Sequence, residues 1–204
     1  VRIWSGARTA DQIAQSKDGS VSGSEPGLLR YYRLDDGPGA PVRDSRSTGP
    51  AHASWNGVLG RAARTFDGFR DAIPLPTVRG DLASRGFTLE AWVYSTATVA
   101  WGRILELATK PGLGAHNISL SRDASTAGLA LRFFRTSGDA VGSVTASDAL
   151  PLHRWTHIAA TYQPMAWDAS GTVTQGDVVL YVDGVAKKTT RVSAPMDVER
   201  PCSY

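Results

Sequence analysis

The sequence predicts an all-β protein, a β-sandwich or β-barrel, with one short helix near the N-terminus. From residue 28 onward, short runs of β-forming residues recur about every ten residues, separated by Gly, Pro, Asp and Ser. Apolar side chains alternate with others over residues 87–94, and an Asp-Gly pair joins two β-forming runs over residues 178–186. Helical periodicity is almost confined to residues 7–14. Many short strands and little helix are typical of sandwiches and barrels.

The N-terminal elements are a strand, the helix and a linker. Residues 1–4 alternate in polarity and predict a strand. Thr9 and Gln12 have the spacing of a capping box, which predicts a helix of about two turns over residues 7–14. Residues 16–27 are rich in Ser and Gly and predict a flexible linker, so we place a domain boundary there.

The other strands follow from β-forming runs between turn residues. They are expected at residues 28–34, 63–66, 72–75, 87–94, 103–108, 118–121, 129–135, 141–146, 156–163, 177–182 and 185–190. In the run 87–94, the alternation places Phe87, Leu89, Ala91 and Val93 on one face and Thr88, Glu90, Trp92 and Tyr94 on the other. Aromatic residues on the second face indicate a central strand that is covered on both sides. Asp183 and Gly184 suit a type I′ turn, because both residues tolerate positive φ.

Composition excludes several classes of function. The chain has 204 residues, of which 42% are hydrophobic and 20% charged, as in globular proteins. It contains no apolar run of about 18 residues, so no membrane span is predicted. The net charge of +3 is spread along the chain and forms no basic stripe, so we expect no nucleic-acid partner. The single cysteine, Cys202, excludes an intrachain disulfide and a Cys-based zinc site.

Six motifs occur in the order that is typical of one domain family. They are LLRYYRLDDG at 28–37, VRDS at 42–45, FDG at 66–68, FTLEAWV at 87–93, RWTHIAATY at 154–162 and LYVDG at 180–184. Together they resemble the LamG-like jelly-roll domain of the concanavalin A-like lectin/glucanase superfamily, which is related to laminin G and pentraxin domains. The resemblance covers residues 28–204 and implies a two-sheet antiparallel β-sandwich of the jelly-roll type.

The resemblance also implies an organisation of the chain. Residues 1–15 resemble the terminal strand and helix of the same domain type, so we expect them to end a preceding repeat. Alternatively, residues 1–4 fill an open edge of the 28–204 sandwich as a permuted closing strand. The family's last strands would follow residue 204, so we expect the 28–204 domain to be truncated at its C-terminal end. The N-terminus also reads as cut, so a missing signal peptide says nothing about secretion.

The sequence shows no catalytic machinery. Glycoside hydrolysis requires two carboxylates that flank the scissile bond. The chain has four Glu residues, and the Glu-x-Asp-x-x-Glu string of the glucanase branch does not occur. Glu90 and Glu106 lie on different predicted strands among apolar residues, and we interpret both as structural carboxylates. His153 and His157 do not converge on a metal from a strand, so both are also interpreted as structural. We expect the chain not to be an enzyme.

A structural calcium ion is implied by the resemblance. Calcium takes hard oxygen ligands from loops. Asp44 opens a loop, residues 44–49, that matches the family's Asp-Ser-Ser-Gly-Asn-Gly loop, except that the Asn is lost and an Arg is present. Asp67, with Asp71 four residues later, is a second source of oxygen ligands. In the alternative interpretation, Asp67 caps a tight turn by accepting backbone N–H bonds.

A carbohydrate site would require aromatic rings beside polar groups. Among the six Trp residues, we expect Trp92 and Trp155 to pack in the core and Trp4 to belong to the first strand. The remaining three lie in predicted loops beside polar residues, and either bind a glycan or cover a loop or neighbouring domain. The candidate binding residues are Trp55, Asn56, Trp101, Arg103, Trp167 and Asp168.

These observations favour a non-catalytic, secreted or cell-surface module, stabilised by calcium, that binds carbohydrate or serves in adhesion. Its expected partners are a glycan, a cell-surface or extracellular protein, and a neighbouring repeat of the same fold. One alternative is an accessory module of a secreted glycosidase, sialidase or peptidase. Another is a purely structural spacer repeat. The fold alone does not decide between them.

Overall fold

The computed structural model describes residues 1–19, 21–36, 40, 42–46, 58–60, 63–67, 71–110, 116–123, 127–136, 139–201 and 203. Its first elements are β1 (Arg2–Ser5), α1 (Ala10–Ser16), β2 (Leu28–Tyr31), β3 (Val58–Gly60), β4 (Ala63–Thr65), α2 (Leu82–Arg85) and β5 (Phe87–Tyr94). The others are β6 (Arg103–Leu107), β7 (Ile118–Arg122), β8 (Leu129–Thr136), β9 (Asp139–Ala146), β10 (Trp155–Trp167), β11 (Val173–Val182) and β12 (Val185–Ser193). Neither helix has the length and apolar character needed to cross a membrane within these ranges.

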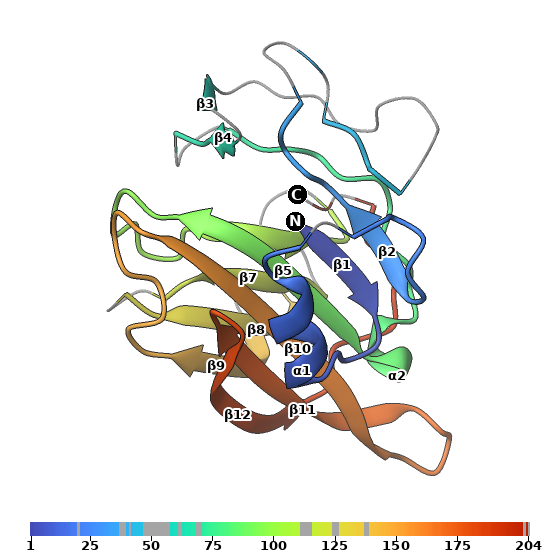
Figure 1. Cartoon of the computed structure of the whole chain (residues 1–204). Coiled ribbons are helices and arrows are strands. Elements are labelled where there is room, and N and C mark those ends of the chain that lie inside the picture. The colour runs from blue at the N-terminus through green and yellow to red at the C-terminus, as the bar shows by residue number, and fades with distance from the viewer. Residues whose placement is uncertain are drawn as a thin grey trace.

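Two antiparallel sheets pack against each other as a β-sandwich (Figure 1). One sheet has six strands in the order β12-β11-β10-β5-β1-β2, and the other has four strands in the order β6-β7-β8-β9. The short strands β3 and β4 pair with each other, above the sandwich in Figure 1. The prediction of a two-sheet antiparallel sandwich is therefore confirmed.

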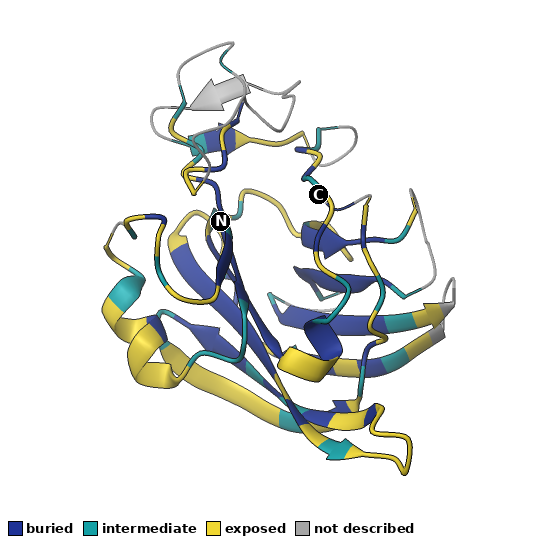
Figure 2. Cartoon of the chain, turned by 90° about the vertical axis from the view of Figure 1, so that its right-hand side faces the viewer, coloured by how far each residue is buried: buried dark blue, intermediate teal, exposed yellow. Residues whose placement is uncertain are grey.

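The core lies between the two sheets, where the buried residues gather in Figure 2. Strand alternation turns Phe87 and Leu89 of β5 inward, as the sequence predicts, and both are fully buried. Phe87 stacks on Tyr162 of β10 with ring centroids 5.5 Å apart. The Phe133 ring of β8 packs in an edge-to-face manner against both, with ring centroids 6.0 Å from Phe87 and 5.4 Å from Tyr162. These three rings join the two sheets through one aromatic cluster.

The Asp-Gly turn and the helix cap form as predicted. Asp183 and Gly184 have φ values of 51° and 83° and connect β11 to β12, which confirms the hairpin. The Thr9 side chain accepts the N–H of Gln12 at 3.2 Å, and the Gln12 side chain accepts the N–H of Thr9 at 2.9 Å. The helix spans Ala10–Ser16, whereas the prediction was residues 7–14, so it begins three residues later and ends two residues later than expected. Both features depend on residues close in sequence.

The helix α1 covers part of the outer face of the six-stranded sheet. Its single buried residue, Ile13, packs against Ala159 of β10 and Tyr181 of β11. The remaining side chains of α1 are exposed or half-buried, so the helix presents one narrow apolar stripe. A helix of seven residues is short and is held in place chiefly by this packing.

The strand β1 lies inside the six-stranded sheet, between β2 and β5. Arg2 pairs with Glu90 on one side and with Tyr31 on the other. Residues 2–5 therefore join the sheet at an interior position and not at an edge, while the expectation that residues 1–15 end a preceding repeat stays a prediction.

The segment predicted as a linker, residues 16–27, connects two elements of one sheet. Arg2 donates to the carbonyl oxygens of Ser16 at 2.8 Å and of Gly19. Val21 packs against Trp4 and the residues around it. The structure thus differs from the predicted linker, because these contacts fold the segment onto β1.

One of the predicted strands is absent, and the one predicted at residues 28–34 ends early. Residues 72–75 form no strand, because Pro74 and Pro76 lack the backbone N–H that a ladder requires. Leu75 nevertheless donates its N–H to the carbonyl of Ser203 at 2.7 Å. The strand expected at residues 28–34 ends at Tyr31, and Leu34 has a positive φ of 63° that is incompatible with a regular strand.

Candidate ligand-binding site

Two predicted binding residues, Trp101 and Arg103, lie together at a pocket of about 310 Å³ on the outer face of the four-stranded sheet. We call it the Trp101 pocket. Its lining residues are Trp101, Arg103, Ser119, Ser121, Arg132, Phe134 and Ala140. Strand alternation explains the polar lining: Leu120 and Leu131 point into the core, so their sequence neighbours point outward.

Trp101 stands at the rim of this pocket in an unusual backbone conformation. Its φ is 61°, in the left-handed region that a bulky residue rarely adopts. The guanidinium carbon of Arg132 lies 3.8 Å from the centroid of the Trp101 ring, which is a cation–π contact. Even so, 51% of the Trp101 surface is exposed. A strained, half-exposed tryptophan beside a polar pocket is a common feature of binding sites.

The side chain of Arg132 is held by one residue of β7 and one residue just after this strand. It donates to Ser121 Oγ at 3.1 Å and to Asp123 Oδ1 at 2.9 Å. Burial lowers the pKa of Arg132, and the negative charge of Asp123 opposes this shift. The two hydrogen bonds hold the guanidinium in one orientation under the Trp101 ring.

Arg103 is paired in the same way with a buried carboxylate. It forms an ion pair with Glu106, which is only 1% exposed. Asn117 Nδ2 donates to Glu106 Oε1 at 2.6 Å and fixes the other oxygen. Both arginines of the Trp101 pocket therefore have a carboxylate beside them. The balance of charges favours an uncharged ligand with many hydroxyl groups over an anion.

The remaining predicted binding residues do not join this pocket. Trp55 and Asn56 lie outside the described residues. Trp167 is 54% exposed and is the last residue of β10. It lies beyond Tyr162, which pairs with Phe87 at the start of β5. Trp101 follows the opposite end of β5, so the two tryptophans lie at opposite ends of the sandwich.

Asp168 holds the turn between β10 and β11. Its Oδ1 accepts the hydroxyl of Ser170 at 2.6 Å, and the N–H groups of Ser170 and Thr172 at 2.9 Å and 3.0 Å. The Ser170 hydroxyl, together with the N–H of Thr172, lowers the pKa of Asp168. We infer that this carboxylate stabilises the turn.

Comparison with known families supplies the classification. The family model for the concanavalin A-like lectin/glucanases superfamily matches residues 66–201. The chain belongs to this superfamily. No curated protein and no solved structure matches it significantly. The resemblance inferred from the sequence motifs is thus confirmed over residues 66–201, and at a coarse level the chain is a lectin-like domain.

The calcium ligand predicted at Asp44 of the lectin-like domain is already engaged. Its Oδ1 accepts the N–H groups of Tyr31 at 3.0 Å and of Arg46 at 3.1 Å. Its Oδ2 lies 3.7 Å from Nε of Arg30. A carboxylate that caps a turn and faces a guanidinium does not fit a calcium ligand in this arrangement.

The other two predicted calcium ligands cap each other's backbone. Asp71 Oδ2 accepts the N–H of Asp67 at 3.0 Å, and Asp67 Oδ1 accepts the N–H of Asp71 at 3.1 Å. This arrangement matches the turn-capping alternative for Asp67. Within the described ranges, no group of three or more His, Cys, Asp or Glu side chains could hold a metal ion. Calcium in this lectin-like domain stays a prediction.

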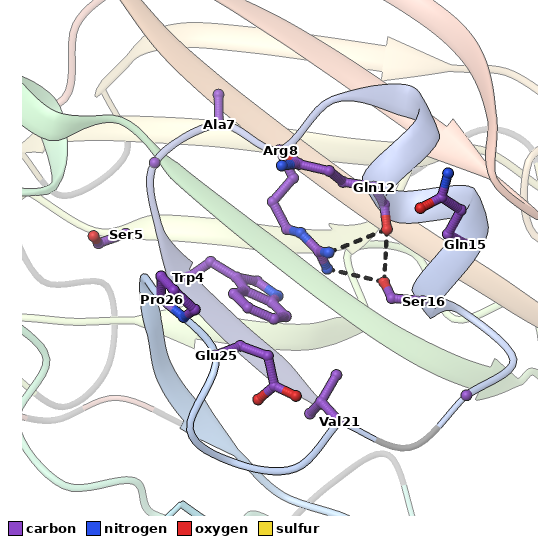
Figure 3. A pocket seen from close by; sticks show the side chains of 12 residues that line it. Trp4, Ser5, Ala7, Arg8, Gln12, Gln15, Ser16, Val21, Glu25 and Pro26 are labelled. Carbon is purple, nitrogen blue, oxygen red and sulfur yellow. Dashed lines mark hydrogen bonds between the residues drawn. The ribbon is translucent and has the colours of Figure 1, made fainter.

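A second pocket, of about 640 Å³, lies between β1, α1 and the segment that contains Val21 and Glu25 (Figure 3). The guanidinium carbon of Arg8 lies 4.0 Å from the ring centroid of Trp4, which is only 4% exposed. Arg8 also donates to Ser16 Oγ at 2.9 Å and to the carbonyl of Gln12 at 3.1 Å (Figure 3). Because the tryptophan of this pocket is covered whereas Trp101 is half-exposed, the Trp101 pocket is the better candidate for a ligand.

Beneath α1, Glu90 is the centre of a buried cluster of charged and polar groups. Its Oε1 accepts Trp4 Nε1 at 2.8 Å and lies 3.5 Å and 3.4 Å from the guanidinium nitrogens of Arg2 and Arg8. Its Oε2 lies 3.5 Å from His157 Nε2. These groups come from β1, β5, β10 and the connection between β1 and α1. The expectation that Glu90 is a structural carboxylate agrees with this geometry.

The Glu90 cluster makes a prediction about acid stability. Burial alone would raise the pKa of Glu90, but hydrogen bonds from His157 and Trp4 and the charge of Arg2 lower it below its ordinary value of 4.5. The contribution of ionised Glu90 to the free energy of unfolding is therefore complete above about pH 4.5. It is lost as the pH falls through the lowered pKa of Glu90. Denaturant unfolding at a series of pH values measures this loss. The Glu90→Gln variant should show a shallower decline in acid, and an equal decline in both proteins would contradict the prediction.

The outer face of β5 and β10 departs from the sequence prediction. Trp92 and Trp155 were expected to pack in the core, yet they are 42% and 49% exposed. The prediction of a doubly covered β5 holds for Glu90, which lies under α1, but not for Trp92 and Tyr94. The helix is too short to cover the far end of the strand.

Proposed function

We propose that this lectin-like domain is a non-catalytic module that binds carbohydrate in the Trp101 pocket. The observation that carries the proposal is an exposed tryptophan ring held beside two charge-balanced arginines. The C–H face of a sugar ring would stack on the face of the Trp101 ring that Arg132 leaves open, while the exposed Arg103 donates to its hydroxyl groups. Because both arginines are paired with carboxylates, an uncharged sugar is the preferred ligand.

The positions of the buried carboxylates support a binding role over hydrolysis. Glu90 belongs to β5 of the six-stranded sheet and Glu106 to β6 of the four-stranded sheet. Each side chain is 1% exposed and paired with arginine. Two carboxylates on the outer faces of opposite sheets do not flank a common glycosidic bond.

The proposal places the domain outside the cell, on a secreted or cell-surface protein. This is where domains of the LamG-like type typically occur. Its partners there would be glycans, alone or attached to other extracellular proteins. The family resemblance implies that calcium stabilises such a module, and binding assays with and without calcium measure this effect.

A glycan array tests the proposal with matched tryptophan variants. We expect Trp101→Ala to weaken glycan binding roughly tenfold or more, because it removes the ring on which the sugar stacks. A tenfold change corresponds to about 1.4 kcal/mol. Trp167→Ala is the control, because Trp167 is similarly exposed but ends β10 of the other sheet. Arrays in calcium and in chelator measure the role of the ion. The proposal would be overturned if the folded wild-type protein bound no glycan on the array, or if the two variants bound equally well.

A further inference from the structure

Three exposed aromatic side chains lie side by side on the outer face of the six-stranded sheet. Tyr94 of β5 pairs directly with Trp155 of β10, so their side chains share a face. Trp92 precedes Tyr94 by two residues and shares this face too. Their exposed fractions are 42% for Trp92, 44% for Tyr94 and 49% for Trp155. We call these three residues the β5–β10 platform.

The rings of the platform are held in place by their neighbours. The Tyr94 and Trp155 centroids are 5.6 Å apart, with an angle of 55° between the planes. Trp92 Nε1 donates to the carbonyl of Lys17 at 2.8 Å, and its ring meets the edge of His157 at 5.4 Å. Immobilised rings lose little conformational entropy when a ligand stacks on them.

The size of the platform points to a small ligand and not to a protein interface. Aromatic side chains of this kind present about 150–250 Å² each, so the exposed area is on the order of 300 Å². A stable protein interface requires about 800 Å² from each partner. A few saccharide units match the platform much better than a second protein does.

The charges around the platform also indicate the chemistry of the ligand. Lys17 is paired with Asp18 at 2.5 Å, and Arg154 forms an ion pair with Asp183. Neither pair leaves a net charge beside the rings. Paired charges at the rim supply hydrogen-bond donors and acceptors without attracting an ion. This combination suits the hydroxyl groups and the apolar ring face of a neutral sugar.

We propose that the β5–β10 platform is a second binding site for neutral oligosaccharides. This inference rests on the proposed carbohydrate-binding function and extends it. The platform lies on the outer face of the six-stranded sheet, whereas the Trp101 pocket lies on the outer face of the four-stranded sheet. One domain thus holds two short glycans at once and cross-links longer ones.

Nuclear magnetic resonance of the indole N–H groups separates the two sites. The probes are cellotriose, maltotriose and mannotriose, each titrated into the full chain. We expect at least one probe to shift the signals of Trp155 and Trp101 in a saturable manner. Trp155→Ala should weaken binding at the platform about tenfold or more and leave the Trp101 shifts intact. Trp167→Ala, which removes an equally exposed tryptophan elsewhere, should change neither.

Each other outcome has a definite meaning. Shifts at Trp101 without shifts at Trp92 or Trp155 overturn the platform and leave the proposed function standing. Shifts at the platform alone support this inference and overturn the assignment of the Trp101 pocket. If none of the three probes shifts the indole N–H signals of Trp92 and Trp155, the inference is overturned. Changes at Trp155 that follow protein concentration without sugar would identify a contact between copies and also overturn it.

Discussion

Replacing Glu90 with alanine is expected to lower the free energy of unfolding by about 3–5 kcal/mol, because removal of one partner from a buried ionic cluster leaves the others uncompensated. The carboxylate is 1% exposed, and the side chains of Arg2 and Arg8 beside it are only 10% and 16% exposed. Its loss would also remove the acceptor of Trp4 Nε1. The strand β1 and helix α1 would then lose a shared anchor to β5.

Denaturant unfolding at neutral pH measures this effect. Glu199→Ala is the control, since Glu199 is exposed, and exposed substitutions usually change stability by less than about 0.5 kcal/mol. Glu90→Gln retains an acceptor for Trp4 and should be intermediate. If Glu90→Ala is no less stable than the control variant, the cluster does not hold β1 and α1 on the sheet.

Replacing Phe133 with alanine should cost about 3–5 kcal/mol, which is the usual range for a buried phenylalanine. Phe133 is 1% exposed and is the contribution of the four-stranded sheet to the aromatic cluster with Phe87 and Tyr162. The cavity would open between the sheets, where backbone strands on both sides resist collapse.

Phe134→Ala is the matched control for this substitution. Phe134 is the next residue of β8, is half-buried and faces the Trp101 pocket on the other side of the strand. It should lose much less stability, as measured by the midpoint of chemical or thermal unfolding. Equal losses in the two variants would show that the contacts between the sheets do not depend on the Phe133 ring.

Local rules predicted the features that depend on neighbours in the chain. The positive φ values of Asp183 and Gly184 follow from the residue types at a two-residue turn. The capping box of Thr9 and Gln12 satisfies N–H groups within one turn of helix. The inward side of β5 follows from strict alternation, which any half-buried strand shows.

The candidate site could be predicted only in part. Trp101 and Arg103 stood out because an aromatic ring and a donor are close in sequence. Arg132 gave no such signal, because it lies on β8 and reaches the Trp101 ring only through the register of β6, β7 and β8. Hydrogen-bonded register is a property of the assembled sheet. A single sequence does not show which residues of distant strands will lie side by side.

The exposure of Trp92 and Trp155 was mispredicted for a related reason. Alternation shows which face of a strand a side chain occupies, but not what covers that face. The position of α1 is set by Ile13 against Ala159 and Tyr181, and the helix ends before it reaches the platform. Coverage is thus decided by packing between segments far apart in the chain.

The sequence by itself determined the fold class, the superfamily and the faces of the main strands, because turn chemistry, alternation and motif order are encoded within short stretches of residues. Only the tertiary structure decided that β1 lies between β2 and β5, and that Glu90 there meets Arg2 and Arg8. Backbone hydrogen bonds are the same for nearly every residue, so they do not choose a partner strand. That choice is made by the side chains that the pairing buries together.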